Sequence, residues 1–102
     1  METLSQMIDK GEVLIGFIED EPQVSYRGIM IDSVRHFISY DYVHRLIDAM
    51  PLVKLNMLHW HLSDDEAFVM QLINHPELAK SGAYDKKSLY SIDQIKQLIT
   101  FA

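Results

Sequence analysis

Residues 55–66 read Leu55-Asn56-Met57-Leu58-His59-Trp60-His61-Leu62-Ser63-Asp64-Asp65-Glu66, and this stretch decides the fold. Side chains alternate between the two faces of a strand, so Met57, His59 and His61 share one face. Leu58 and Trp60 share the opposite face. Both faces are largely apolar, which is typical of a strand that is covered on both sides in a parallel sheet. We therefore predict such a strand over residues 55–62, with Trp60 packed in the core.

Three acids follow this predicted strand directly. Asp64, Asp65 and Glu66 come two residues after its last apolar position. The loops beyond the carboxyl ends of parallel strands are where α/β enzymes carry their chemistry. Two imidazoles on one strand face, with carboxylates at the strand tip, therefore mark a candidate functional site.

Working outward, residues 26–33 predict an earlier strand around the apolar run 29–31. Between the two strands, apolar residues recur on one face at helical spacing, namely Tyr42, Val43, Leu46, Ile47 and Met50. Pro51 should end or kink this helix near Met50, because proline lacks an amide hydrogen and disfavours a helical residue before it. Strand, helix and strand make a βαβ unit.

The rest of the chain predicts shorter elements. After a short extended piece over residues 68–73, a short helix starts at His75-Pro76 and is closed by Gly82. Ser91 and Gln94 have capping-box spacing, which predicts a second crossover helix. Its apolar face is expected to consist of Ile92, Ile95, Leu98, Ile99 and Ala102.

The first residues predict a separate region. Thr3 and Gln6 also have capping-box spacing, for a short helix that Gly11 could stop. Residues 13–18 read as a strand, which the acidic stretch before Pro22 breaks.

Composition limits the possible functions. The chain has 102 residues and a formal net charge of −6, which argues against nucleic acid or an anionic membrane surface as a partner. No apolar run approaches the roughly 20 residues that a membrane span needs. There is no cysteine, so disulfides and thiolate metal sites are excluded.

Two motifs together resemble the start of the catalytic barrel of the β-N-acetylhexosaminidases, glycoside hydrolase family 20. The first has the family order of Arg-Gly, three apolar residues, Asp, two small residues, Arg-His and an aromatic, and it reads Arg27-Gly28-Ile29-Met30-Ile31-Asp32-Ser33-Val34-Arg35-His36-Phe37. The second has the family order of Lys-x-Asn, two apolar residues, His-Trp-His, two residues and Asp-Asp, and it runs from Lys54 to Asp65.

The resemblance implies an α/β fold, a partial (β/α)8 TIM barrel. Residues 23–102 would form its first two βα units. Residues 1–22 would be the tail of a preceding α+β domain and the connection to it, so that Met1 need not be the natural start. A complete barrel of this kind takes about 250 residues, so we expect an amino-terminal fragment of one.

The family removes terminal β-linked N-acetylglucosamine or N-acetylgalactosamine from glycans and glycoconjugates with retention, through substrate assistance rather than two carboxylates. No cofactor is implied. The family's catalytic Asp-Glu pair follows the fourth strand, downstream of this chain. We therefore expect no catalytic residue here and no activity from these residues alone. The family also implies a lysosomal, secreted or otherwise exported protein.

The resemblance implies substrate binding by Arg35, whose planar guanidinium suits vicinal hydroxyls. Asp64 would support the active site, together with His61 and Asp65. In the family the first Asp of the pair joins a downstream histidine, and Asp65 is expected to bond loop amides. Arg27 and Asp32 are expected to be structural groups of the barrel. The loop after Asp65 departs from the family pattern.

Two alternatives stay open. His59 and His61 form a His-x-His pair near a carboxylate, the pattern of metal-dependent, amidohydrolase-like barrels. Those enzymes carry the pair on the first strand and need further ligands, so we expect no metal here. Uncovered strand edges and faces also predict association into a homo-oligomer, which a non-catalytic self-associating module would share.

Overall fold

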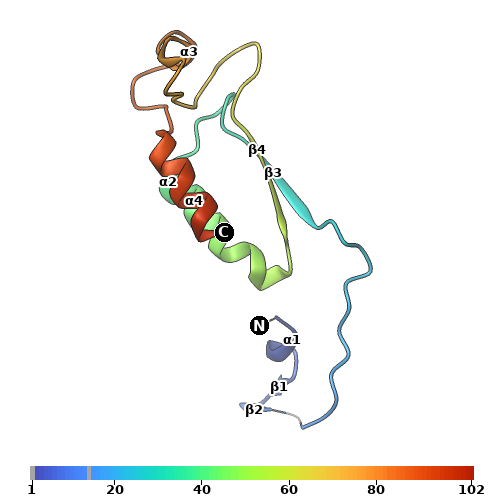
Figure 1. Cartoon of the computed structure of the whole chain (residues 1–102). Coiled ribbons are helices and arrows are strands. Elements are labelled where there is room, and N and C mark those ends of the chain that lie inside the picture. The colour runs from blue at the N-terminus through green and yellow to red at the C-terminus, as the bar shows by residue number, and fades with distance from the viewer. Residues whose placement is uncertain (1, 14) are drawn as a thin grey trace.

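The computed structural model describes residues 2–13 and 15–102. Its elements, in chain order, are α1 (Glu2–Ser5), β1 (Ile8–Asp9), β2 (Glu12–Val13), β3 (Gly28–Asp32), α2 (Tyr40–Ala49), the 3-10 helix η1 (Met50–Val53), β4 (Met57–His61), α3 (Pro76–Gly82) and α4 (Ile92–Phe101). The Cα radius of gyration is 18.5 Å, whereas a compact domain of this length has about 13 Å. The excess arises because α1, β1 and β2 lie away from the other elements, at the end of an extended connection (Figure 1).

The centre of the fold is the predicted βαβ unit. β3 and β4 pair in parallel, from Gly28 opposite Met57 to Asp32 opposite His61. Both strands are shorter than predicted, but their existence and parallel pairing are confirmed. Figure 1 shows α2 and α4 on the same side of this strand pair.

The path of α2 follows from local chemistry. The Ser39 hydroxyl accepts the amide of Tyr42 and caps the start of the helix. At Met50 the chain tightens into η1, which contains Pro51 and is followed by its C-cap Lys54 in a left-handed conformation (φ 60°). The prediction that Pro51 would end or kink the helix near Met50 is therefore confirmed, because α2 ends at Ala49 and η1 turns the chain into β4.

A polar clasp fixes the amino ends of the two strands. The Arg27 Nε donates to the Lys54 carbonyl at 2.6 Å, and Nη1 donates to the Val24 carbonyl at 2.7 Å. The Asn56 side chain accepts the Arg27 amide at 3.0 Å and donates to the Ser25 carbonyl at 2.8 Å. These bonds can form in only one alignment, so they set the register of β3 against β4. Arg27 thus has the structural role that we expected.

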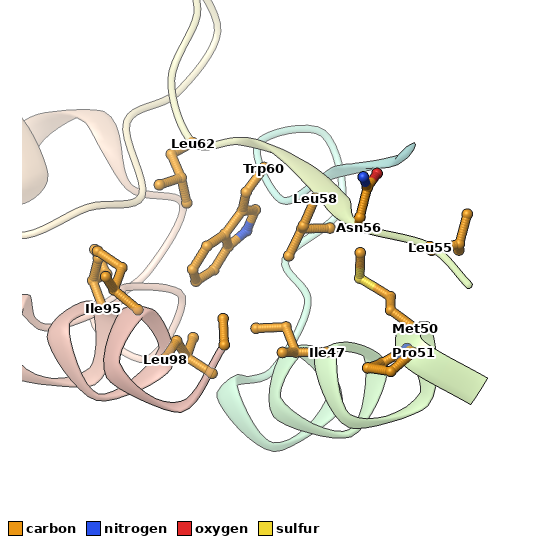
Figure 2. Close-up of a pocket in the computed structure, with 12 residues that line it drawn as sticks. Ile47, Met50, Pro51, Leu55, Asn56, Leu58, Trp60, Leu62, Ile95 and Leu98 are labelled. Atoms are coloured by element: carbon orange, nitrogen blue, oxygen red, sulfur yellow. The ribbon is translucent and has the colours of Figure 1, made fainter. Parts of the chain in front are cut away.

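Two buried clusters hold the helices on the strands. Ile31, Val43 and Leu98 form one between the strand pair and the helices, and Val34, Ala67, Val69 and Tyr90 form the other near the carboxyl ends of the strands. Trp60 packs against both clusters, which confirms the prediction that it lies in the core. Figure 2 shows Leu58 and Trp60 pointing from β4 toward the helices, where they line an open apolar groove of about 420 Å³.

The helix predicted after Ser91 is confirmed as α4, together with its cap. Gln94 donates its amide to the Ser91 hydroxyl at 3.2 Å, and its side chain accepts the Ser91 amide at 2.9 Å. The predicted apolar face is wider than the buried one, because Leu98 is 2% exposed and Ile99 is 72% exposed. α3 ends at Gly82 as predicted, where any side chain would meet Phe68 at 2.8 Å.

Three predictions for the first residues are wrong. Thr3 lies within α1 rather than at its N-cap, and its hydroxyl donates to Asp20. Gly11 does not stop a helix. It forms the β1–β2 hairpin turn with Lys10, where both residues have positive φ. The strand predicted over residues 13–18 is confined to Val13, because β1 pairs only with Glu12–Val13 and residues 15–18 form no strand. Leu14 lies outside the described residues.

The two neighbouring residues on α4 give a test of this packing. Leu98→Ala should lower the free energy of unfolding by about 2–5 kcal/mol, because it leaves a cavity between the helices and the strands. Ile99→Ala is the matched control and should change it by less than about 0.5 kcal/mol, because this side chain is exposed. Urea unfolding followed by circular dichroism measures both. Equal losses for the two variants would contradict this packing.

Candidate active site

A polar cluster lies at the carboxyl ends of the two parallel strands. Asp32 ends β3, His61 ends β4, and the two are paired in the strand register. The loops that follow these strands bring Arg35 and Asp64 to the same edge. The strand pairing thus gathers four polar residues from two separate sequence segments.

Arg35 joins the two loops. Its Nη1 lies 2.9 Å from Asp32 Oδ2 and 2.9 Å from Asp64 Oδ2. His61 Nε2 lies 3.0 Å from the same Asp64 oxygen. One guanidinium nitrogen therefore bridges two carboxylates, and one of these carboxylates also binds the imidazole.

The second oxygen of each carboxylate holds its own loop. Asp32 Oδ1 accepts the amides of Val34 at 2.9 Å and Arg35 at 3.1 Å. Asp64 Oδ1 accepts the amides of Glu66 at 2.8 Å and Ala67 at 3.3 Å. Aspartate side chains commonly fix turns in this way. Each acid thus positions its loop with one oxygen and the Arg35 guanidinium with the other.

These contacts keep both carboxylates ionised. The Arg35 side chain, then the backbone amides of Arg35 and Val34, lower the pKa of Asp32 from 3.8 to about 2. The hydrogen bond from His61, helped by the loop amides and Arg35, lowers the pKa of Asp64. In turn, Asp32 and then Asp64 raise the pKa of Arg35. At neutral pH the site therefore presents a fixed cation between two anions.

The guanidinium also faces outward. The Arg35 side chain is 54% exposed, whereas the Asp64 side chain is 13% exposed. The hydrogen bond of this guanidinium to Asp32 and its 2.9 Å contact with Asp64 both use Nη1. The remaining N–H donors can therefore bind hydroxyls of a ligand while Nη1 stays anchored.

The structure brings together three of the four residues singled out from the sequence, namely Arg35, His61 and Asp64. Asp65 lies exposed on the same loop. We expected Asp65 to accept hydrogen bonds from the loop amides, but Asp64 accepts them instead. Sequence reasoning missed the place of Asp32 in this cluster. The available signal was its position at a strand end, three residues before Arg35, the spacing at which a carboxylate can accept a turn amide.

The His-x-His pair does not form a metal centre with its neighbours here. His61 binds Asp64, and His59 is exposed on the open face of β4 opposite Met30. Within residues 2–13 and 15–102, no group of three or more His, Cys, Asp or Glu side chains could hold a metal ion. The same part of the chain has no helix long and apolar enough to cross a membrane.

In α/β enzymes, both barrels and doubly wound sheets, the functional site lies at the carboxyl ends of the parallel strands, where this polar cluster lies. The sequence model described as "Glycosyl hydrolase family 20, catalytic domain" matches residues 24–102. This chain therefore belongs to glycosyl hydrolase family 20.

Individual relatives agree. Beta-hexosaminidase A of Caenorhabditis elegans is 42% identical over 108 aligned residues, which cover 100% of this chain and 20% of the relative. Chitooligosaccharidolytic beta-N-acetylglucosaminidase of Bombyx mori is 38% identical over an alignment that covers 99% of this chain and 18% of the relative. The solved structure of a family 20 β-N-acetylglucosaminidase matches with a TM-score of 0.80 and 32% identity, over 98% of this chain and 22% of that one. The chain thus spans about a fifth of the length of its relatives.

The lowered pKa of Asp32 predicts a defined acid sensitivity. An ionised Asp32 stabilises the fold at full strength above about pH 4, and this contribution is lost as the pH falls through about 2. The difference in unfolding free energy between the parent chain and Asp32→Asn should therefore be constant from pH 5 to 7 and shrink below about pH 4. Asp48→Asn, an exposed change on α2, is the control. A difference that disappears already near pH 5 would contradict the Asp32–Arg35 pair.

Proposed function

We propose that this chain forms the amino-terminal, substrate-binding part of a β-N-acetylhexosaminidase barrel. β3, α2, β4 and α4 would be its first two βα units, within residues 23–102, and residues 1–22 would belong to a preceding domain. The observation that carries the proposal is Arg35, held between Asp32 and Asp64 at the carboxyl ends of two parallel strands. The match of the family over residues 24–102 supports this placement.

Arg35 would bind hydroxyls of the terminal N-acetylhexosamine. A guanidinium offers several donors in one plane, which suits neighbouring hydroxyls on a sugar ring. The two carboxylates around Nη1 orient that plane before the sugar arrives, so little side-chain freedom is lost on binding. Asp64 would couple Arg35 to His61, and Asp65 would line the same loop.

The chemistry would require residues beyond these. A general acid must carry a proton at the working pH. Asp32 and Asp64 have lowered pKa values, so both are ionised at neutral pH and unsuited to protonating a leaving oxygen. Retaining, substrate-assisted cleavage, in which the acetamido oxygen attacks the anomeric carbon, would therefore use an acid elsewhere in the barrel. We propose that these 102 residues alone bind but do not cleave.

Self-association would bury the exposed face and the free edges of β3 and β4. Met30 and Met57, on the open face, are 53% and 46% exposed. β3 and β4 also pair only with each other among the described residues, so each has a free edge. Exposed apolar faces and free edges favour pairing with further strands. We therefore propose a homo-oligomer for the isolated chain and, from the family resemblance alone, a lysosomal or otherwise exported parent enzyme.

Hydrolysis of a chromogenic β-N-acetylglucosaminide tests the enzymatic proposal. The 102 residues alone should show no turnover. A hybrid in which residues 24–102 replace the matching segment of the C. elegans relative should be active. In that hybrid Arg35→Ala should lower kcat/KM by about 10–100-fold, the cost of charged hydrogen bonds, and Arg35→Lys should lower it less.

Two outcomes would contradict this proposal. Turnover by the 102 residues alone would show that the catalytic acid lies within them. An active hybrid that Arg35→Ala leaves unchanged would remove Arg35 from substrate binding. Circular dichroism of each hybrid checks that the variants fold.

Light scattering tests the oligomer. The parent chain should have a mass above the 11.9 kDa of a monomer, and Met57→Lys should shift it toward that value because a charge disfavours burial of this face. Tyr84→Lys, also at an exposed position but outside both strands, is the control and should leave the mass unchanged. A parent chain that stays monomeric at all concentrations would contradict self-association.

A further inference from the structure

The loop that carries Arg35 is held at both ends by one tyrosine from the second βα unit. Tyr90 is fully buried, directly before the N-cap of α4. Its hydroxyl lies 2.9 Å from the Ser33 hydroxyl, where the loop begins, and contacts the Ile38 carbonyl, where the loop ends. Arg35 lies between these two points.

Each hydroxyl in this network has one proton to donate, and this fixes the direction of each hydrogen bond. The Ile38 carbonyl can only accept, so the Tyr90 hydroxyl donates its single proton there. The Ser33 hydroxyl then donates to Tyr90 and accepts the indole N–H of Trp60 at 2.9 Å. Each proton is used once, and the three donors form a continuous chain from β4 through the end of β3 to the end of the loop.

Tyr90 is held by ring packing and by backbone hydrogen bonds. Its ring packs against Phe37, with centroids 4.7 Å apart, and edge-on against Trp60 at 4.6 Å. Its amide donates to the Val69 carbonyl at 2.8 Å, and its carbonyl accepts the Gln71 amide at 2.9 Å. Ser33 is also fully buried. A hydrogen bond lost in this dry environment cannot be replaced by water, so the network is rigid.

We propose that Tyr90 and Ser33 are positioning residues for substrate binding by Arg35. Tyr90, which precedes α4 in the second βα unit, thereby fixes the position of Arg35, the proposed ligand contact in the first unit. This inference rests on the proposed function for the role of Arg35, but the pinning of the loop itself can be measured without any substrate.

Amide hydrogen exchange in the 102-residue chain tests the pinning. Tyr90→Phe removes only the hydroxyl and should speed exchange of the Val34 and Arg35 amides about tenfold, the effect of losing one buried hydrogen bond. Tyr40→Phe is the matched control, because its hydroxyl binds Gln97 on α4 and not the loop. Ser33→Ala should act like Tyr90→Phe and serves if that variant does not fold. Unchanged exchange in a folded variant overturns the inference.

Kinetics of the active hybrid enzyme test the positioning. Tyr90→Phe and Ser33→Ala should raise KM about tenfold while kcat stays within about twofold, because they misplace a group that binds the substrate and the transition state equally. Tyr40→Phe should change neither constant. Faster exchange with an unchanged KM would make the network purely structural and overturn the inference. A parent hybrid with no turnover would reject the proposed function and the role of Arg35, while the exchange rates still decide whether Tyr90 holds the loop.

Discussion

The in-register parallel pairing of β3 with β4 is the constraint on which the rest of the structure depends. It places Asp32 opposite His61, so that the loops after both strands open at the same edge. A slip of one residue would turn every side chain of one strand to the other face and separate the four polar groups. At the opposite end, Arg27 and Asn56 hold the register with bonds to backbone carbonyls. The conspicuous motif residues thus divide into a group that aligns the strands and a group at the carboxyl edge, where we propose that the substrate binds.

The electrostatics of the site suit binding rather than proton transfer. Two carboxylates with lowered pKa values surround one guanidinium and leave its outer donors available. Such a cluster is already organised without a ligand and keeps its charge through the neutral range. These electrostatics fit the substrate-binding role that we propose for a chain that spans about a fifth of the length of its relatives, because substrate binding and bond cleavage need not share one βα unit.

Local signals in the sequence predicted the local structure well. The period-2 pattern of residues 55–62, the proline after α2 and the Ser91–Gln94 cap each act over a few residues, and each is confirmed. The failures are cases in which a local signal lacked its tertiary partner. The apolar run after Val13 found no strand to pair with, and Thr3 binds Asp20, 17 residues away, instead of capping a helix. Arg35 and Asp64 could be singled out by their motif, but the contact from Tyr90 to Ser33 spans 57 positions and has no sequence signature.

Trp60 gives the molecule an optical property that follows from its packing. It is the one tryptophan in the sequence. Its indole N–H is bonded to Ser33, and its ring meets Tyr90 edge-on. The partly buried fluorophore therefore packs against both buried clusters and is bonded to the residue at which the loop that carries Arg35 begins. Its emission wavelength and quenching depend on whether that hydrogen bond and that aromatic contact are intact. The fluorescence of Trp60 thus reports whether the loop that carries Arg35 is held in place, without any label added to the protein.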